Sequence, residues 1–142
     1  MVRPGFAFST RFNVRYAEID GQKVVFNSRY LEYADVAISE FWNWTGIHAA
    51  LGELWAATEF HVRHVAVDYR IPFVLGDTVE AFVRIERIGV SSLTQVFELC
   101  NAVTGALHTV ITMVVVNVHL PTGTPAPIEP AIRAFLETLP KA

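Results

Sequence analysis

The sequence of 142 residues has one cysteine, no long apolar run and no excess of basic residues. The single Cys100 excludes an internal disulfide framework and is typical of a reducing compartment. The net charge is −3, from 11 basic and 14 acidic residues, so no broad basic surface is available to bind nucleic acid. No segment approaches the ~18 apolar residues of a membrane span, and the N-terminal residues lack a secretory signal core. We therefore expect a cytoplasmic protein without nucleic-acid or membrane partners.

Apolar residues, by contrast, are abundant. They make up 52% of the chain, and charged residues make up only 18%, which excludes a disordered or linker-like chain. A single domain of this length does not bury that much apolar surface in its own core. We expect part of the surplus to contact a partner subunit or to line a pocket.

Residue periodicity predicts a strand followed by a long helix. Over residues 6–16, every second residue is mostly apolar, with Phe6 and Tyr16 at the two ends of the apolar face. From 29 to 45 the apolar residues recur at three- and four-residue steps, and Gly46 follows as a helix terminator. Asn27 or Ser28 is expected to cap the start of this helix.

The second half of the chain predicts mainly strands. The expected elements are a short helix over 48–54, strands over 59–70, 78–88, 92–102 and 106–120, and a terminal helix over about 129–139 with Pro130 in its first turn. The last strand is apolar on both faces, so we expect both faces to be covered. Short connections favour antiparallel pairing, and one long helix against such a sheet predicts an α+β architecture. No repeat or boundary is visible, so residues 1–142 are expected to form one domain with a core of about 6–120.

Several segments carry a family resemblance. They are the segment 16–27, the helix opening 28–35, and the strand and turn segments 67–72, 76–79 and 89–93. Over roughly residues 8–120, they resemble the 4-hydroxybenzoyl-CoA thioesterase family of hotdog-fold proteins. The resemblance implies a curved antiparallel sheet wrapped around one long helix. It also implies subunits that pair through a continuous sheet as a homodimer or tetramer, and active sites at the subunit interface. The implied activity is hydrolysis of acyl-CoA thioesters without a metal or cofactor.

Individual positions follow from this resemblance. Asp20 matches the family's catalytic aspartate, and Asn27 sits where a backbone N–H polarises the thioester carbonyl. Tyr30 and Asp35 match recurrent helix positions with structural roles, and Tyr30 is also a candidate substrate-binding residue. Lys23 replaces a frequent glycine, and Asn27 occupies a position where many bacterial relatives carry histidine or tyrosine. Both departures bear on substrate choice or acyl placement.

The chemistry is consistent with these residue types. A carboxylate can act as nucleophile or as general base for water, and both roles stay open for Asp20. The first N–H groups of a helix lack intrahelical partners and can bind the developing oxyanion. The alternative is that Asp20 is only a turn residue before Gly21 and Asn27 only a helix cap. Glu18 is expected to face solvent, although it remains a backup carboxylate.

Other polar and aromatic residues are weaker candidates. Because coenzyme A is anionic, we expect Arg87, with Ser91 and Ser92, to contact its phosphates; the alternative for Arg87 is a solvated hairpin arginine. His64 is a candidate for the acyl pocket. His61 and His64 are the only closely spaced histidines, and strand alternation predicts opposite faces for them, so no metal site is expected. Four aromatic residues are candidates either for an acyl-pocket wall or for ordinary core, namely Phe41, Trp42, Trp44 and Trp55.

The sequence thus predicts an acyl-CoA thioesterase. A non-catalytic module that binds acyl-CoA or an acyl carrier protein is the alternative, since fold does not fix function. A hotdog dehydratase or hydratase requires a histidine with an acidic partner in a different motif, which is not found. The acyl group, the choice between coenzyme A and a carrier protein, and the choice between dimer and tetramer stay open.

Overall fold

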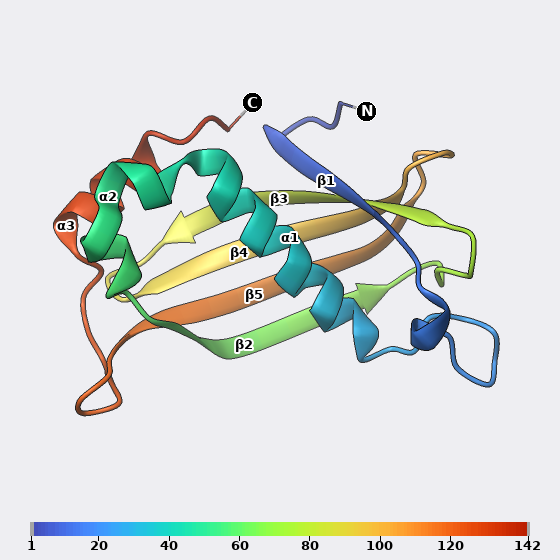
Figure 1. The fold of residues 1–142 in the computed structure, drawn as a ribbon, viewed down its shortest axis with the longest axis horizontal. Coiled ribbons are helices and arrows are strands. Elements are labelled where there is room, and N and C mark those ends of the chain that lie inside the picture. The colour runs from blue at the N-terminus through green and yellow to red at the C-terminus, as the bar shows by residue number, and fades with distance from the viewer. Residues whose placement is uncertain (1, 142) are drawn as a thin grey trace.

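One curved antiparallel sheet carries a long helix across its concave face in the computed structural model, which describes residues 2–141 (Figure 1). The elements are β1 (Phe8–Asn13), the 3-10 helix η1 (Tyr16–Glu18), α1 (Arg29–Thr45), α2 (Ile47–Ala56), β2 (Phe60–Tyr69), β3 (Thr78–Ile88), β4 (Ser92–Asn101), β5 (Leu107–His119), β6 (Thr124–Pro125) and α3 (Pro130–Glu137). The predicted order of strands and helices is confirmed, and the short β6 lies within the segment predicted as a loop.

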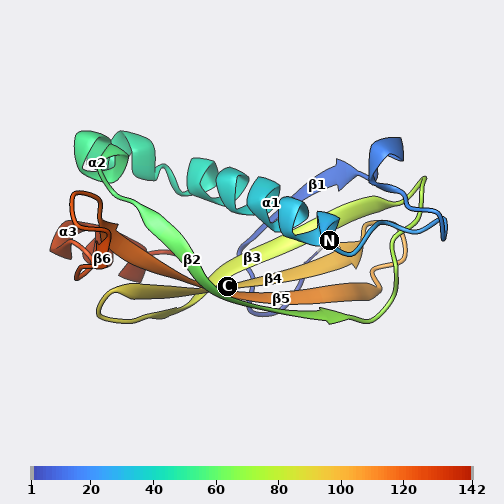
Figure 2. The same ribbon diagram turned by 90° about the horizontal axis from the view of Figure 1, so that it is seen from below.

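The strands lie in the order β1-β3-β4-β5-β2, and β6 pairs with β5 outside this path. Every pairing is antiparallel. Seen edge-on, α1 forms one layer and the sheet the other (Figure 2). The α+β hotdog arrangement is therefore confirmed. This arrangement places β1 and β2 at the two ends of the strand order.

Helix α1 packs on the sheet through small residues in its middle. Ala34 and Ala37 are 1% and 0% exposed, and they belong to the main core together with Phe41. Small side chains here let the helix backbone approach the strands closely. Gly46 ends the helix in the left-handed conformation, with φ 73°, as predicted. Ser28, one of the two predicted residues, stands at the N-cap, but its side chain makes no capping hydrogen bond.

The first strand ends earlier than its alternation predicts. After Asn13 the chain turns into η1, and Tyr16 is 80% exposed instead of belonging to the apolar face. The cause is Glu18, whose Oε1 accepts the Arg15 backbone N–H at 2.8 Å and bends the chain. In β5, the outward-facing Val110 and Val114 are only half-buried, so one chain does not cover both faces of this strand.

A bulge in β2 changes which residues share a face. His61 pairs with Val116 and His64 with Val114, and the register shifts between Val62 and His64. Since Val114 and Val116 lie on one face of β5, the two histidines also share a face. The prediction that they point to opposite faces is wrong, because simple alternation ignores the extra residue. Within residues 2–141, no group of three His, Cys, Asp or Glu side chains lies close enough to hold a metal ion.

The remaining helices cover one end of the sheet. Trp42 and Trp55 have ring centroids 4.9 Å apart and pack in the second apolar cluster, where α3 contributes Ile132 and Leu136. Pro130 occupies the start of α3, as predicted. Cys100 lies in β4 and is fully buried. No helix among residues 2–141 is long and apolar enough to cross a membrane.

Candidate active site

The candidate site begins with a tight loop between η1 and α1. An isolated bridge pairs Ile19 with Val25, and the Asp20 N–H donates to the Val24 carbonyl at 2.9 Å. The Lys23 N–H returns to the Asp20 carbonyl at 3.0 Å. Lys23 has φ 66°, the left-handed conformation in which a glycine is free of strain. The backbone thus explains why the resembled family frequently has glycine at this position.

Asp20 holds this loop with only one of its carboxylate oxygens. Oδ1 accepts the Gln22 backbone N–H at 2.7 Å, which is the turn role expected of an aspartate here. Within residues 2–141, Oδ2 accepts no hydrogen bond. The side chain is half-buried. The turn role therefore leaves one carboxylate oxygen available for chemistry.

The start of α1 presents backbone donors that the protein does not use. Neither the Asn27 nor the Ser28 N–H donates a hydrogen bond within the described part of the chain, and the Asn27 side chain does not cap the helix. The Asn27 carbonyl accepts the Tyr69 hydroxyl at 2.9 Å, which ties the helix start to β2. Unused N–H groups at a helix N-terminus attract negative charge.

A small pocket of about 170 Å³ adjoins these donors. It is lined by Val25, Asn27, Tyr30, Tyr69, Arg70, Ile71 and Pro72. Tyr30 is 2% exposed, and its hydroxyl accepts the Phe73 N–H at 3.0 Å. The Tyr30 and Tyr69 rings meet edge to face, with centroids 5.1 Å apart. Burial raises the pKa of Tyr30, so it stays a neutral phenol. Asp20 is not among the lining residues.

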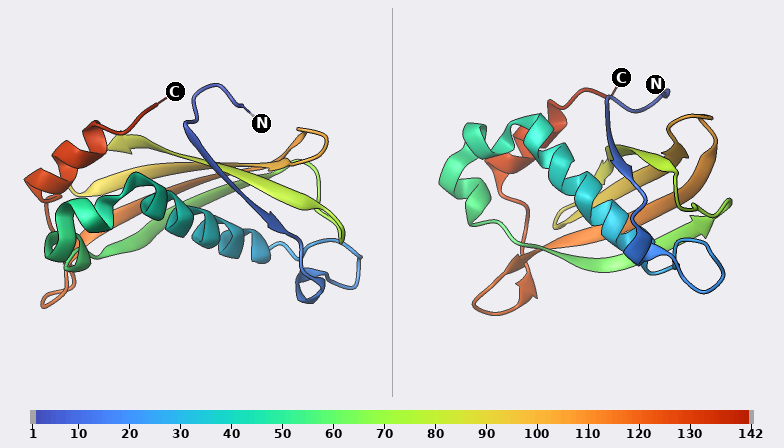
Figure 3. Two further views of the ribbon diagram at one scale, coloured as in Figure 1. Left: turned by 45° about the horizontal axis from the view of Figure 1, so that its top comes forward. Right: turned by 45° about the vertical axis from the view of Figure 1, so that its right-hand side comes forward.

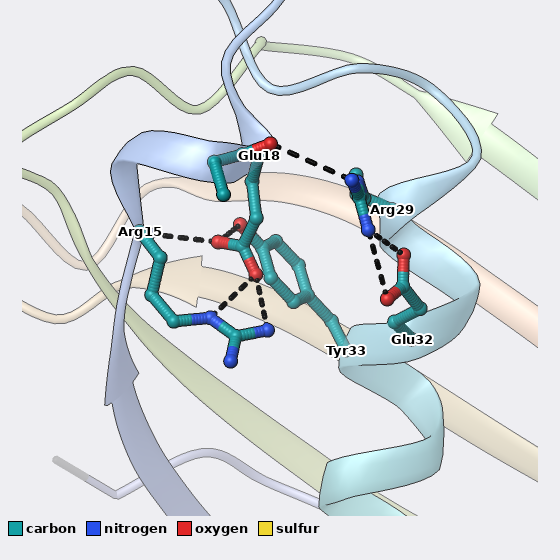
Figure 4. A network of polar contacts seen from close by, with 6 residues as sticks. Arg15, Glu18, Arg29, Glu32 and Tyr33 are labelled. Atoms are coloured by element: carbon teal, nitrogen blue, oxygen red, sulfur yellow. Dashed lines mark hydrogen bonds and ion pairs between the residues drawn. The ribbon is translucent and has the colours of Figure 1, made fainter.

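Sequence reasoning missed a polar network behind this loop, in which Glu18 and Tyr33 are buried and Arg15 is largely exposed (Figure 4). Glu18 is 2% exposed, so the prediction that it faces solvent is wrong. Its carboxylate accepts the Tyr33 hydroxyl at 2.8 Å, and the Arg15 guanidinium at 3.0 and 2.8 Å. The spacing of three residues between Arg15 and Glu18 is the only sequence signal for this pair. Figure 4 also shows Arg29, which pairs with Glu32 and donates to the Ala17 carbonyl at 3.5 Å.

Hydrogen bonding decides the charge on Glu18. Burial by itself would raise the pKa of this carboxyl. The Arg15 N–H, the Tyr33 hydroxyl and the Arg15 guanidinium outweigh burial, so the pKa of Glu18 lies below its ordinary value. Burial and the neighbouring carboxylate raise the pKa of Tyr33. The network therefore consists of a carboxylate, a guanidinium and a neutral phenol, and it joins the end of η1 to α1.

Within one chain, the other predicted site residues lie toward the end of the sheet that is far from the Asn27 pocket. Ser92 pairs with Val116, which is also the partner of His61, whereas Tyr69 pairs with Thr109 at the opposite end of β5. His64 and Arg87 are exposed. Ser91, in the turn between β3 and β4, and Ser92, at the start of β4, are half-buried. One chain thus brings Asn27 and Tyr30 together with the pocket. It does not bring His64, Arg87, Ser91 and Ser92 to them.

Residues 14–136 match the Thioesterase-like superfamily, and the chain belongs to this family. This match does not assign the chain to the narrower group of 4-hydroxybenzoyl-CoA thioesterases. No curated protein matches the sequence.

Similar solved structures cover nearly the whole chain. A thioesterase from Thermus thermophilus, in complex with coenzyme A and Zn, is 27% identical with a TM-score of 0.77, covering 94% of this chain and 100% of its own. A 1,4-dihydroxy-2-naphthoyl-CoA thioesterase from Synechocystis is 18% identical, with a TM-score of 0.78 and 93% and 96% coverage. The probable thioesterase YbaW from Escherichia coli is 22% identical, with a TM-score of 0.77 and 91% and 96% coverage. The two likenesses below 25% identity show the fold alone.

Proposed function

We propose that this protein hydrolyses acyl-CoA thioesters at the start of α1. The observation that carries the proposal is the pair of unused N–H groups at Asn27 and Ser28, beside a pocket and one short loop away from Asp20. Membership in the Thioesterase-like superfamily supports the proposal, as does the similarity to a thioesterase that binds coenzyme A. Acyl-CoA is accordingly the proposed substrate.

In this proposal the thioester carbonyl oxygen lies against the Asn27 N–H. Negative charge that develops on this oxygen is stabilised by the helix N-terminus, and losing one such donor typically costs ~10²–10³ in rate. The free oxygen of Asp20 either removes a proton from the attacking water or attacks the carbonyl carbon itself. The C–S bond then breaks, and coenzyme A leaves as a thiolate, so no strong general acid is required. If Asp20 itself attacks, the mixed anhydride so formed is then hydrolysed by water, which releases the free acid and regenerates the carboxylate.

In this proposal the remaining predicted residues reach the site from a second subunit. Strand β2 ends the strand order, and its outer edge has no partner within residues 2–141. Two copies that pair antiparallel along β2 about a two-fold axis exchange ends. The end with His64, Arg87, Ser91 and Ser92 in one copy then approaches the Asn27 end of the other. We therefore propose a homodimer, or a dimer of dimers, in which these residues contact the acyl or nucleotide part of the substrate.

The decisive variant is Asp20→Asn. Asparagine retains an oxygen that accepts the Gln22 N–H, so the turn is preserved while the charge and basicity are lost. We expect the release of thiol from acyl-CoA to fall by about 10²–10⁴-fold with the fold unchanged. The assay is run with short, long, branched and aromatic acyl-CoAs, and folding is checked by thermal melting. The matched control is Glu40→Gln, because Glu40 is an exposed carboxylate further along α1.

The outcomes separate the alternatives. A folded Asp20→Asn variant with full activity would remove Asp20 from the mechanism. Tight acyl-CoA binding without turnover by the wild type would instead establish a non-catalytic binding module. For an active wild type, repeated turnover in ¹⁸O-labelled water distinguishes the two roles of Asp20. Label that enters the Asp20 carboxylate indicates a nucleophile, and label found only in the product acid indicates a general base.

A further inference from the structure

A second and larger cavity lies at the other end of α1. Strand β1 pairs with β3 only as far as Val83. Within residues 2–141, the segment 84–88 of β3 has no strand beside it on that side. The start of β1 lies on one side of this free segment, and α3 with the C-terminal residues lies on the other (Figure 3, left). The notch between them holds a cavity of about 350 Å³. This volume is in the range of small-molecule sites.

Aromatic and aliphatic side chains form an apolar part of the cavity wall. The Phe8 and Phe41 rings meet edge to face with their centroids 5.6 Å apart. The centroids of the Trp44 and Phe8 rings are 5.3 Å apart. Leu136 and Leu139 line the opposite side. Trp44 remains 42% exposed although it belongs to the aromatic cluster. An occupant with an apolar body would cover this surface.

The rim of the cavity carries excess positive charge. Four cations line it, namely Arg84, Arg87, Arg133 and Lys141, against two carboxylates, Glu86 and Glu137. Among the described residues, one of these carboxylates is neutralised inside the rim, because Arg84 pairs with Glu86 at 2.7 Å.

The positive charge is partly held in place before any ligand binds. The Arg133 guanidinium donates to the carbonyls of Gly89 and Val90, which fixes it beside the turn between β3 and β4. Arg84 lies over the Phe6 ring, with 4.5 Å between its guanidinium carbon and the ring centroid. A guanidinium that is already ordered loses less freedom when it binds an anion.

We propose that this cavity binds a small amphiphilic carboxylate, with its alkyl or aryl body against Phe8, Phe41 and Trp44 and its head group at the basic rim. The excess of two positive charges favours an anion, and the two carboxylates in the rim favour a monoanion over a phosphate dianion. Within one chain the cavity is separate from the pocket at Asn27, and Arg87 is a rim residue that the dimer proposal also places near the substrate of the other copy. Helix α1 has 17 residues, which separates its two ends by about 25 Å.

The probe is decanoate, below the concentration at which it forms micelles. Binding is followed by calorimetry and by the emission of Trp44, which lines the cavity. We expect saturable binding of one decanoate per chain, weaker binding of the uncharged decanol and of decyl phosphate, and no binding of acetate. The variant Trp44→Phe should lose most of the emission change and still bind in the calorimeter.

Two variants of different kinds test the location. Arg84→Gln/Lys141→Gln removes two rim charges and should weaken decanoate binding about tenfold or more. Its matched control, Lys23→Gln/Arg63→Gln, removes the same charge from exposed positions outside the cavity and should leave the affinity unchanged. Ala7→Phe places a ring in the notch and should abolish binding, provided that the melting temperature shows a folded protein.

Each outcome decides the proposal without reference to hydrolysis. Decanoate binding that fails to saturate, or that the two double variants weaken equally, would overturn it. Decyl phosphate binding as tightly as decanoate would overturn the assignment to a monoanion. Because the readout is direct binding, the cavity proposal stands or falls separately from the thioesterase proposal. An Asp20→Asn protein should bind decanoate with wild-type affinity.

Discussion

Glu18 is a carboxylate whose surroundings differ from what its polarity predicts. A carboxylate at 2% exposure is costly unless it is paired and hydrogen-bonded, and here four bonds from Arg15 and Tyr33 supply that compensation. The same residue's carbonyl accepts the Phe26 N–H at 2.9 Å. Glu18 therefore connects the end of η1, the start of α1 and the loop that carries Asp20.

We predict that Glu18→Gln destabilises the protein by about 2–3 kcal/mol at pH 7. Because the folded-state pKa of Glu18 lies below its ordinary value of 4.5, the folded state binds this proton less tightly than the unfolded state. The contribution of the carboxylate is complete above the unfolded pKa and is lost as the pH falls through the folded pKa. Urea unfolding at pH 7 and at lower pH should therefore show the gap between wild type and variant closing in acid.

Glu32→Gln is the matched control for that measurement. Glu32 pairs with Arg29 at 3.0 Å, but its side chain is 49% exposed. An exposed pair of this kind contributes about 0–1 kcal/mol because solvent screens it. A Glu32→Gln effect as large as that of Glu18→Gln, or a Glu18→Gln effect that does not change with pH, would contradict the assigned role of burial.

At the scale of elements, the contact between α1 and the sheet depends on the absence of large side chains. We predict that Ala37→Leu destabilises the protein by about 1–3 kcal/mol, because Ala37 is 0% exposed and its neighbours are close-packed. Val36→Leu is the control on the same helix, since Val36 is 45% exposed. Thermal unfolding compares the two variants. Equal melting temperatures for both would show that the helix is less tightly packed than described.

Element positions were largely predictable because they depend on local pattern. The bounds of α1 follow from apolar residues at helical spacing and from Gly46, and β3 follows from alternation that stops before Gly89. The errors arise where distant contacts override the pattern. Tyr16 leaves the strand face because Glu18 bends the chain toward Arg15, and no sequence period contains that information.

The candidate site was predictable only in part for the same reason. The position of Asn27 follows from the helix start, since any helix leaves its first N–H groups unpaired. The pocket beside it requires Tyr69 from β2, a residue 42 positions away whose hydroxyl reaches the Asn27 carbonyl. Likewise the bulge in β2, which places His61 and His64 on one face, is fixed by pairing with β5.

At the scale of the whole molecule, the structure shows where part of the surplus of apolar residues lies. Large apolar side chains stay exposed along β2 and the segment after it, with Val62 at 60%, Tyr69 at 50% and Leu75 at 54%. The same strand forms the end of the sheet. A long exposed edge of this kind pairs readily with another chain. Together these observations favour the pairing of two copies along β2.

We predict that Ala66→Lys disrupts this pairing. Ala66 is exposed near the middle of β2, so a two-fold axis there brings the two introduced charges close together. By sedimentation, the wild type should exceed the 15.8 kDa mass of one chain, and the variant should approach it. Thioester hydrolysis should fall with dimer mass, because each proposed site takes residues from both copies. Val103→Lys, at an 88% exposed position in the turn between β4 and β5, should change neither. An active wild-type monomer would refute the shared site.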